Sequence, residues 1–275
     1  MAAAITSKSN SDILQISDGL CTLKISNAEP YSFVDTTAGL SGLLDSLQKL
    51  PTAPPSLFID LEGENLSRHG TISILQIYVA PSKRTYLIDI HTLGKTAFST
   101  AGASGWTLQQ MLESADIPKV FFDVRNDSDA LYKHFRIRLA GIQDLQLMEV
   151  ATRPSRRKHV NGLARCIERD GSLSPAESKR WKDCKEKGVR FFAPEHGGSY
   201  AVFNQRPLSK EILQYCIQDV HFMPPLWAYY NGKMTPQWQR RVEIASNERV
   251  RLSQSPAYVS HGQHKALAPG DWLHL

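Results

Sequence analysis

Three runs rich in strand-forming residues follow one another, with short connections, between residues 57 and 90. They cover 57–61, 71–79 and 85–90, and strands spaced this closely pair as an antiparallel meander. Beyond them, short apolar runs alternate with segments of helical periodicity, an order typical of parallel strands with covering helices. The pattern therefore predicts an α/β fold with a mixed sheet flanked by helices.

The other expected elements follow from apolar spacing and from helix-breaking residues. Short strands are expected at 119–123 and 141–145, and helices at 36–49, 106–115, 126–135, 160–169, 175–187, 209–230 and 234–252. Pro224 and Pro225 should kink or end the 209–230 helix, because proline lacks an amide hydrogen and clashes with the preceding turn. Residues 191–205 are predicted to form a loop, and residues 253–275 an irregular tail.

Length and composition predict one main domain in an intracellular setting. We expect an N-terminal segment at 1–31, the domain at 32–231, and a C-terminal helix and irregular tail at 232–275. No apolar stretch approaches the roughly 20 residues of a membrane span, and the N-terminus lacks the apolar core of a secretory signal. The four cysteines are scattered and are expected to be reduced thiols. The protein should therefore be nuclear or cytoplasmic, not secreted and not bound to a membrane.

Charge is divided unevenly along the chain, although the net charge is only +5. Residues 1–150 carry 12 Lys and Arg against 16 Asp and Glu, whereas residues 151–275 carry 20 against 11. An acidic half suits cation binding, and a basic half suits a polyanion such as nucleic acid. Two solvated surfaces would give the same totals, so the decision rests on the motifs.

The first acidic motif lies on the strand that starts at Leu57. Asp60 and Glu62 share a face with Phe58, because successive side chains of a strand alternate between its two faces. Two carboxylates about 7 Å apart repel each other unless a cation joins them. The alternative interpretation is a strand end with two solvated acids.

Two further acidic groups follow along the chain. Asp123, Asp127 and Asp129 lie where a strand turns into a helix, and ligands of α/β sheets gather at such strand ends. An aspartate at this place can also act only as a helix N-cap. On the 209–230 helix, Tyr215 and Asp219 are four residues apart and share a face. A hydrogen-bonded surface pair would have the same spacing.

Together, the three acidic segments resemble the RNase D-like 3′-5′ exonucleases, whose motifs are Asp-Glu-Asp-Asp with a tyrosine. The resemblance pairs the first motif with Asp60 and Glu62, the second with Asp127, and the third with Tyr215 and Asp219. Residues 70–76 and 205–209 are similar to the segments that accompany the first and third motifs. The amino-acid sequence around Asp127 is most similar to that of the Egalitarian-like branch of the family. The resemblance covers about residues 32–231 and implies an RNase H-like α/β fold.

The resemblance also implies a reaction. It is hydrolysis of phosphodiester bonds at the free 3′ end of single-stranded RNA or DNA, with two Mg²⁺ or Mn²⁺ ions about 3.5–4 Å apart. Asp60 would contact both ions, Glu62 and Asp219 would complete the first site, and Asp127 would hold the second. Tyr215 would orient the attacking water, since a phenol with a pKa near 10 is a poor base at neutral pH.

Basic and aromatic residues are expected to guide the nucleic-acid strand to the metal ions. The loop after the acidic half offers four phosphate contacts, Arg153, Arg156, Arg157 and Lys158. Tyr200 follows a glycine-containing turn and is expected to stack on the end nucleotide. A second basic run, Lys179 to Lys187, is periodic in lysine and is interpreted as a solvated helix face.

Some residues depart from the family pattern. Phe122 stands where many relatives have His, Phe203 stands where a Trp is common, and the segment 170–199 is longer than in compact relatives. These departures leave the choice between RNA and DNA open. The Egalitarian-like branch contains members that bind nucleic acid with little or no turnover, so the alternative function is an RNA-binding adaptor. The complete ligand set favours an active exonuclease, and no protein partner is indicated.

Overall fold

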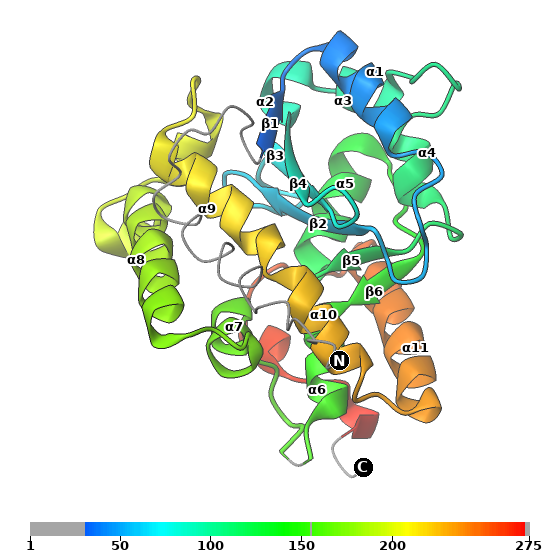
Figure 1. The fold of residues 1–275 in the computed structure, drawn as a ribbon, viewed down its shortest axis with the longest axis vertical. Coiled ribbons are helices and arrows are strands. Elements are labelled where there is room, and N and C mark those ends of the chain that lie inside the picture. Colours follow the sequence, from blue (N-terminus) through cyan, green and yellow to red (C-terminus); the bar gives the residue numbers. More distant parts are fainter. Residues whose placement is uncertain (1–30, 155, 273–275) are drawn as a thin grey trace, which may run out of the picture.

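A computed structural model of the chain describes residues 31–154 and 156–272. Its centre is a six-stranded sheet in the order β1-β4-β3-β2-β5-β6 (Figure 1). The strands are β1 (Tyr31–Val34), β2 (Leu57–Glu62), β3 (Ile74–Val79), β4 (Arg84–Asp89), β5 (Lys119–Phe121) and β6 (Ile142–Asp144). β2, β3 and β4 form an antiparallel meander, while β1, β5 and β6 pair in parallel with their neighbours. The predicted mixed sheet is confirmed.

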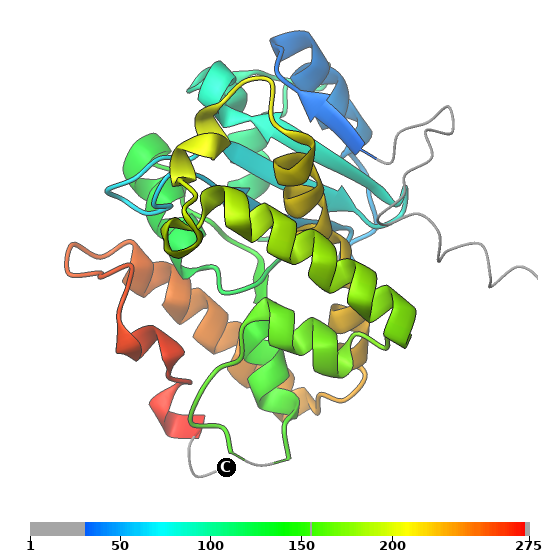
Figure 2. The same ribbon diagram turned by 90° about the vertical axis from the view of Figure 1, so that its left-hand side faces the viewer.

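Helices cover both faces of this sheet (Figures 1 and 2). The α-helices are α1 (Thr37–Ser46), α2 (Ile90–Leu93), α3 (Thr96–Ser99), α4 (Leu108–Glu113), α5 (Arg125–Phe135), α6 (Leu145–Thr152), α7 (Leu163–Asp170), α8 (Pro175–Phe192), α9 (Lys210–His221), α10 (Met223–Asn231) and α11 (Pro236–Ser253). Four short 3₁₀ helices are η1 (Pro194–His196), η2 (Tyr200–Asn204), η3 (Gln263–Ala266) and η4 (Gly270–Trp272). None of the helices in the described ranges is long and apolar enough to cross a membrane.

The two faces of β2 belong to different cores. Leu57, Ile59 and Leu61 pack with residues of α1, α4 and α5 in one core. Phe58 packs in the other, with residues of α6 and α10, and a neighbouring cluster lies under α9. Since side chains alternate along a strand, Asp60 lies on the face that α9 and α10 cover.

The predicted 209–230 helix is two helices in the structure. α9 ends at His221, and α10 begins one residue later, after Phe222. Pro224 and Pro225 lie in the first turn of α10, where a missing amide hydrogen leaves no helical hydrogen bond unmade. The expectation that the prolines end the helix is confirmed.

Several regions differ from the sequence-based prediction, among them the short helices α2 and α3, which were not expected. α6 was not expected, because its residues 145–151 are buried all round and therefore show no amphipathic period. The predicted loop 191–205 contains the end of α8 together with η1 and η2. β1 was also missed, since four residues are too few to establish a period.

The tail after α11 is more ordered than the sequence suggests. It contains η3 and η4, and Trp272 is only 1% exposed. The Trp272 ring lies edge-on to Trp238 of α11, with 5.2 Å between ring centroids. The predicted N-terminal segment 1–31 lies outside the described residues, apart from Tyr31 at the start of β1. Cys166 and Cys216 are buried thiols, as expected, and Cys21 falls in the same undescribed segment.

Candidate metal centre

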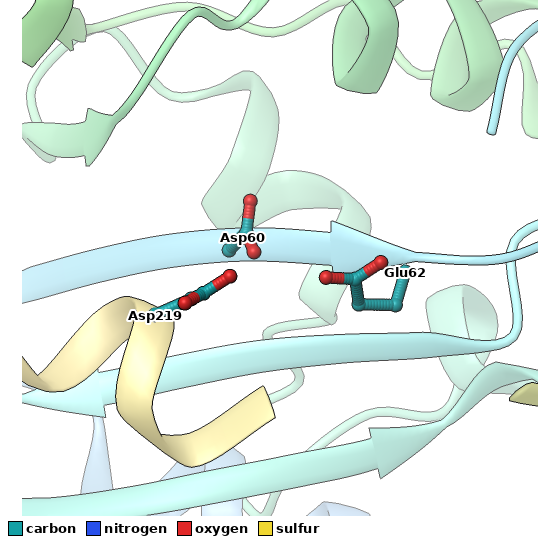
Figure 3. Close-up of side chains that lie close together, drawn as sticks. All are labelled: Asp60, Glu62 and Asp219. Carbon is teal, nitrogen blue, oxygen red and sulfur yellow. The ribbon is translucent and has the colours of Figure 1, made fainter. Parts of the chain in front are cut away.

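β2 and α9 bring three carboxylates together. Each of Asp60, Glu62 and Asp219 offers an oxygen that lies within 4.8 Å of the oxygens of the other two (Figure 3). The first two come from the face of β2 that α9 covers, and Asp219 comes from the last turns of α9. The predicted first and third motifs therefore meet in space, although about 157 positions separate Glu62 from Asp219 in the sequence.

Asp127, in the first turn of α5, lies beside this group rather than within it. The residue is 5% exposed, and its Oδ1 has no hydrogen-bond partner in the part of the chain that the structure describes. The tail braces the start of α5, since Tyr258 Oη and Lys265 Nζ donate to Asn126 Oδ1 at 2.7 and 2.5 Å. A buried carboxylate oxygen without a partner is costly, so Oδ1 of Asp127 is available to a cation at this place.

The neighbouring aspartates have partners of their own. Asp129 forms an ion pair with Arg68, at 2.6 Å between Oδ1 and Nε, and also accepts from the Arg68 amide at 2.7 Å. Asp123 forms an ion pair with Arg125. Both side chains hold the fold together, whereas Asp127 keeps an oxygen available. This contrast favours Asp127 over the two alternatives.

Without a bound cation, burial and mutual repulsion favour the protonated, neutral form of these carboxyl groups. Burial, followed by the charge of Asp219, raises the pKa of Asp60 to about 7. Burial and the charges of Asp60 and Asp219 raise the pKa of Glu62 well above its ordinary value. For Asp127, burial and the charge of Asp60 also raise the pKa. A divalent cation would remove this repulsion and bind to oxygen ligands, so the donor set fits Mg²⁺ or Mn²⁺.

Lys185 of α8 is a member of the site that the sequence analysis missed. Its Nζ lies 2.6 Å from both Oδ1 and Oδ2 of Asp219. The same ammonium lies 4.1 Å from the centroid of the Tyr215 ring. The interpretation of the 179–187 run as a solvated face is therefore wrong for Lys185. No spacing rule could single it out, because its role depends on how α8 packs against α9.

Tyr215 lies one helical turn before Asp219, on the same side of α9. Its ring is 8% exposed and packs edge-on against Phe192, with 4.9 Å between centroids. Burial, followed by the charge of Asp219, raises the pKa of the phenol well above its ordinary value. The hydroxyl therefore stays protonated at neutral pH and can orient a water molecule, but it is a poor general base.

Tyr200 reaches the site only through another ring. It lies in η2, half-buried, with its ring 5.6 Å from that of Phe192, which in turn contacts Tyr215. Gly197, in the turn before it, has φ of 80°, a conformation that glycine adopts without strain. Stacking of Tyr200 on a nucleotide stays a prediction.

The predicted phosphate contacts lie in the loop between α6 and α7, which starts at the end of α6 that points away from the sheet (Figure 1). Arg153 forms an ion pair with the buried Glu149, and the guanidinium of Arg157 lies 4.8 Å from the Trp238 ring. Arg156 and Lys158 are exposed. The structure therefore does not bring these four residues into the carboxylate group, and their contact with nucleic acid stays a prediction.

The same loop borders a basic cavity of about 490 Å³. Its cationic lining residues are Arg153, Arg156, Arg165, Arg169 and Lys233. Two of these charges are neutralised locally, because Arg153 pairs with Glu149, and Arg169 pairs with both Glu149 and Asp170. The remaining cationic residues of the cavity, Arg156, Arg165 and Lys233, are exposed.

Comparisons with known proteins identify the family and the fold. The model of the 3′-5′ exonuclease domain family matches residues 31–234. The fold is similar to that of Trypanosoma brucei RNase D in complex with GMP, with a TM-score of 0.71 and 23% identity over 89% of this chain and 70% of that one. The complex of the same enzyme with RNA U12 gives a TM-score of 0.70 at 22% identity, over 89% and 78% of the two chains.

Among curated proteins, the mouse piRNA biogenesis protein EXD1 is 39% identical over 94 residues. That stretch is 34% of this chain but only 15% of the mouse protein, so the likeness is local. The family model, by contrast, covers the whole sheet and all the predicted ligands. The chain belongs to the 3′-5′ exonuclease domain family and has an RNase D-like fold.

Proposed function

We propose that the protein removes nucleotides from the 3′ end of a single-stranded nucleic acid by metal-dependent hydrolysis. The observation that carries the proposal is the convergence of half-buried and buried carboxylates that repel one another, with an unpartnered oxygen on Asp127. A fold that needed only stability would have paired Asp60, Glu62 and Asp127 as well, as it pairs Asp129 with Arg68.

The positions of the carboxylates suggest a role for each. Asp60 interacts electrostatically with Asp127 on one side and lies within the group of Glu62 and Asp219 on the other. It would therefore hold both cations, with Glu62 and Asp219 completing one site and Asp127 the other. The cations, when bound, would activate a water molecule and neutralise charge on the leaving oxygen.

Tyr215 would orient that water. Its ring is held by Phe192 and by the ammonium of Lys185, so the hydroxyl has a fixed direction. Because the phenol keeps its proton at neutral pH, it would donate a hydrogen bond rather than remove a proton. Its contribution would be alignment of the attacking oxygen.

We propose RNA as the substrate. Support comes from the likeness to an RNase D bound to RNA U12 and from the local similarity to a piRNA biogenesis protein. The test is to incubate the purified protein with 5′-labelled single-stranded RNA or DNA in Mg²⁺, Mn²⁺ or EDTA. We expect a ladder of shortened RNA in either metal and none in EDTA. Absence of shortening of any strand would overturn the proposal.

A second candidate is an RNA-binding adaptor without turnover. The observation that favours it is the Lys185–Asp219 ion pair, which satisfies part of the centre without a metal. An adaptor would bind RNA with equal affinity in Mn²⁺ and in EDTA, and would leave its length unchanged. Filter binding performed alongside the labelled-strand assay separates the two functions.

A further inference from the structure

Lys185 occupies a place in the carboxylate group that a cation would otherwise take. Its ammonium donates to both oxygens of Asp219 at 2.6 Å, and the side chain is only 20% exposed. Asp219 is itself 5% exposed, and its oxygens lie within 4.8 Å of those of Asp60 and Glu62. An ammonium is a compact charge with three donors, so it can neutralise such a group from one point.

The fold holds Lys185 there through a close helix contact. One turn later on α8, a Cβ at Gly188 would lie 2.7 and 2.8 Å from Cδ2 and Cβ of Tyr215, closer than real contacts allow. The absence of a side chain lets α8 lie directly against α9 (Figure 2). The Lys185 ammonium then lies over the Tyr215 ring and meets Asp219.

We propose that Lys185 is an intramolecular counter-ion that competes with a divalent cation for Asp219. The inference rests on the proposed metal-dependent function and adds a determinant of metal affinity to it. Lys185 already donates to both oxygens of Asp219, and a divalent cation on the same oxygens would lie beside an ammonium of like charge, so loading the first site favours withdrawal of Lys185. The metal-free protein gains stability from the pair, and metal affinity falls by the same free energy.

The four-carbon stem makes this exchange feasible. Rotation about its bonds can withdraw the ammonium towards solvent without moving α8, since a fifth of the side chain is already exposed. Lys185 therefore sets the cation concentration at which the site fills. A substitution that removes the charge but keeps the length of the stem should bind metal more tightly.

The test compares Lys185→Met with Lys187→Met in the full chain without nucleic acid. Lys187 lies on the same helix, is exposed, and has no ion pair among the residues that the structure describes. Mn²⁺ binding is measured by titration calorimetry, and melting temperature is measured with and without Mn²⁺. We expect Lys185→Met to bind Mn²⁺ about tenfold more tightly, a change of about 1.4 kcal/mol, and Lys187→Met to match the wild type.

Melting adds an independent readout. Without metal, Lys185→Met should melt at a lower temperature than the wild type, and Mn²⁺ should raise its melting temperature by the larger amount. Should that variant fail to fold, Lys185→Gln, which is polar and neutral, carries the same comparison.

The outcomes separate the two proposals. Wild-type protein that binds Mn²⁺ through Asp60, beside a Lys185 variant of equal or weaker affinity, would overturn the competition and leave the nuclease proposal standing. If neither protein binds Mn²⁺, the metal mechanism fails and the competition fails with it. Binding by the Lys185 variant alone would be the strongest support.

Discussion

At the scale of single residues, the buried and half-buried aspartates near the centre divide into those with a cationic partner and those without one. Asp129 pairs with Arg68, and Asp144 with Arg249. Asp60 and Asp127 have no ion pair within the described ranges and instead face other carboxylates. The two classes therefore respond in opposite ways to loss of charge.

Asp60→Asn is expected to remove activity while stabilising the metal-free protein. The pKa of Asp60 is raised by burial and by Asp219 to about 7, above the unfolded value of about 4. The stability that this group contributes is complete below pH 4 and is lost as pH rises through 7. In EDTA, wild-type stability should fall over that window, and the variant should show a flatter profile. The rate in Mn²⁺ should drop more than about tenfold.

Asp129→Asn is the matched control. It breaks the ion pair and leaves the half-buried Arg68 guanidinium without its negatively charged partner, which costs up to about 3–5 kcal/mol, the loss found for fully buried pairs. Chemical denaturation at neutral pH should show this loss. Superimposable pH profiles for wild type and Asp60→Asn would contradict the assigned origin of the shift.

Tyr215→Phe is expected to slow the chemical step without weakening binding. The change removes one hydroxyl and keeps the ring that packs against Phe192. Loss of an orienting group lowers kcat by roughly 10- to 1000-fold. Tyr230→Phe is the control, since its hydroxyl donates to Asp170, outside the carboxylate group. Equal single-turnover rates in the two variants would remove Tyr215 from the mechanism.

The acidic residues of the site could be predicted from the sequence, but Lys185 could not. Asp60 and Glu62 are two apart on a strand, and Tyr215 and Asp219 are four apart on a helix, so local periodicity assigns each pair to one face. Lys185 reaches Asp219 only because two helices approach closely. That approach is a tertiary contact, and the spacing of lysines within α8 carries no trace of it.

At the scale of elements, the α8–α9 contact decides how the centre is covered. Gly188 is the residue that permits it, because a Cβ at that position would lie only 2.7 Å from Cδ2 of Tyr215. β1 and α6 could not be predicted from the sequence, for two different reasons. One is too short to display a period, and the other is buried on every side, so neither shows the polar–apolar alternation that a sequence reveals.

Gly188→Ala should therefore destabilise the protein, although alanine is the better helix former. The added Cβ would overlap Tyr215, and overpacking of this kind costs about 1–3 kcal/mol. Gly42→Ala in α1 is the control, because a Cβ there meets nothing within 4 Å. It should gain about 0.5–1 kcal/mol from helix propensity. Urea denaturation of both variants gives the comparison, and a stabilised Gly188→Ala would contradict the close contact.

At the scale of the whole molecule, the centre lies where the two halves of the chain meet. Asp60, Glu62 and Asp127 come from the acidic half, while Asp219 and Lys185 come from the basic half. The tail closes the same region, since Lys265 and Tyr258 both reach Asn126. These contacts join residues far apart in the chain. This explains why the sequence predicts an irregular tail where the structure has a packed one.

The basic half of the chain, residues 151–275, should bind the RNA strand at a distance from the bond that is cut. Arg156→Ala combined with Lys158→Ala removes two exposed charges and no ion pair of the described chain. We expect weaker RNA binding and a salt dependence shallower by about two units of log slope or less, with an unchanged chemical step. Lys49→Ala combined with Lys95→Ala, exposed on the face that carries α1 and α3, should leave binding unaltered. Equal salt slopes in the two double variants would contradict the proposed contact of Arg156 and Lys158 with RNA.

Under the proposed function, metal ions held by Asp60, Glu62, Asp127 and Asp219 contact the bond that is cut. The most direct measurement uses RNA whose last linkage carries sulfur in place of one non-bridging oxygen, with the two stereoisomers separated. Sulfur binds Mg²⁺ poorly and Mn²⁺ better, because Mn²⁺ is the softer ion. For one isomer, we predict single-turnover cleavage at least about tenfold slower than for unmodified RNA in Mg²⁺, with recovery in Mn²⁺. Sulfur substitution that slows cleavage equally in both metals, or not at all, would contradict the account.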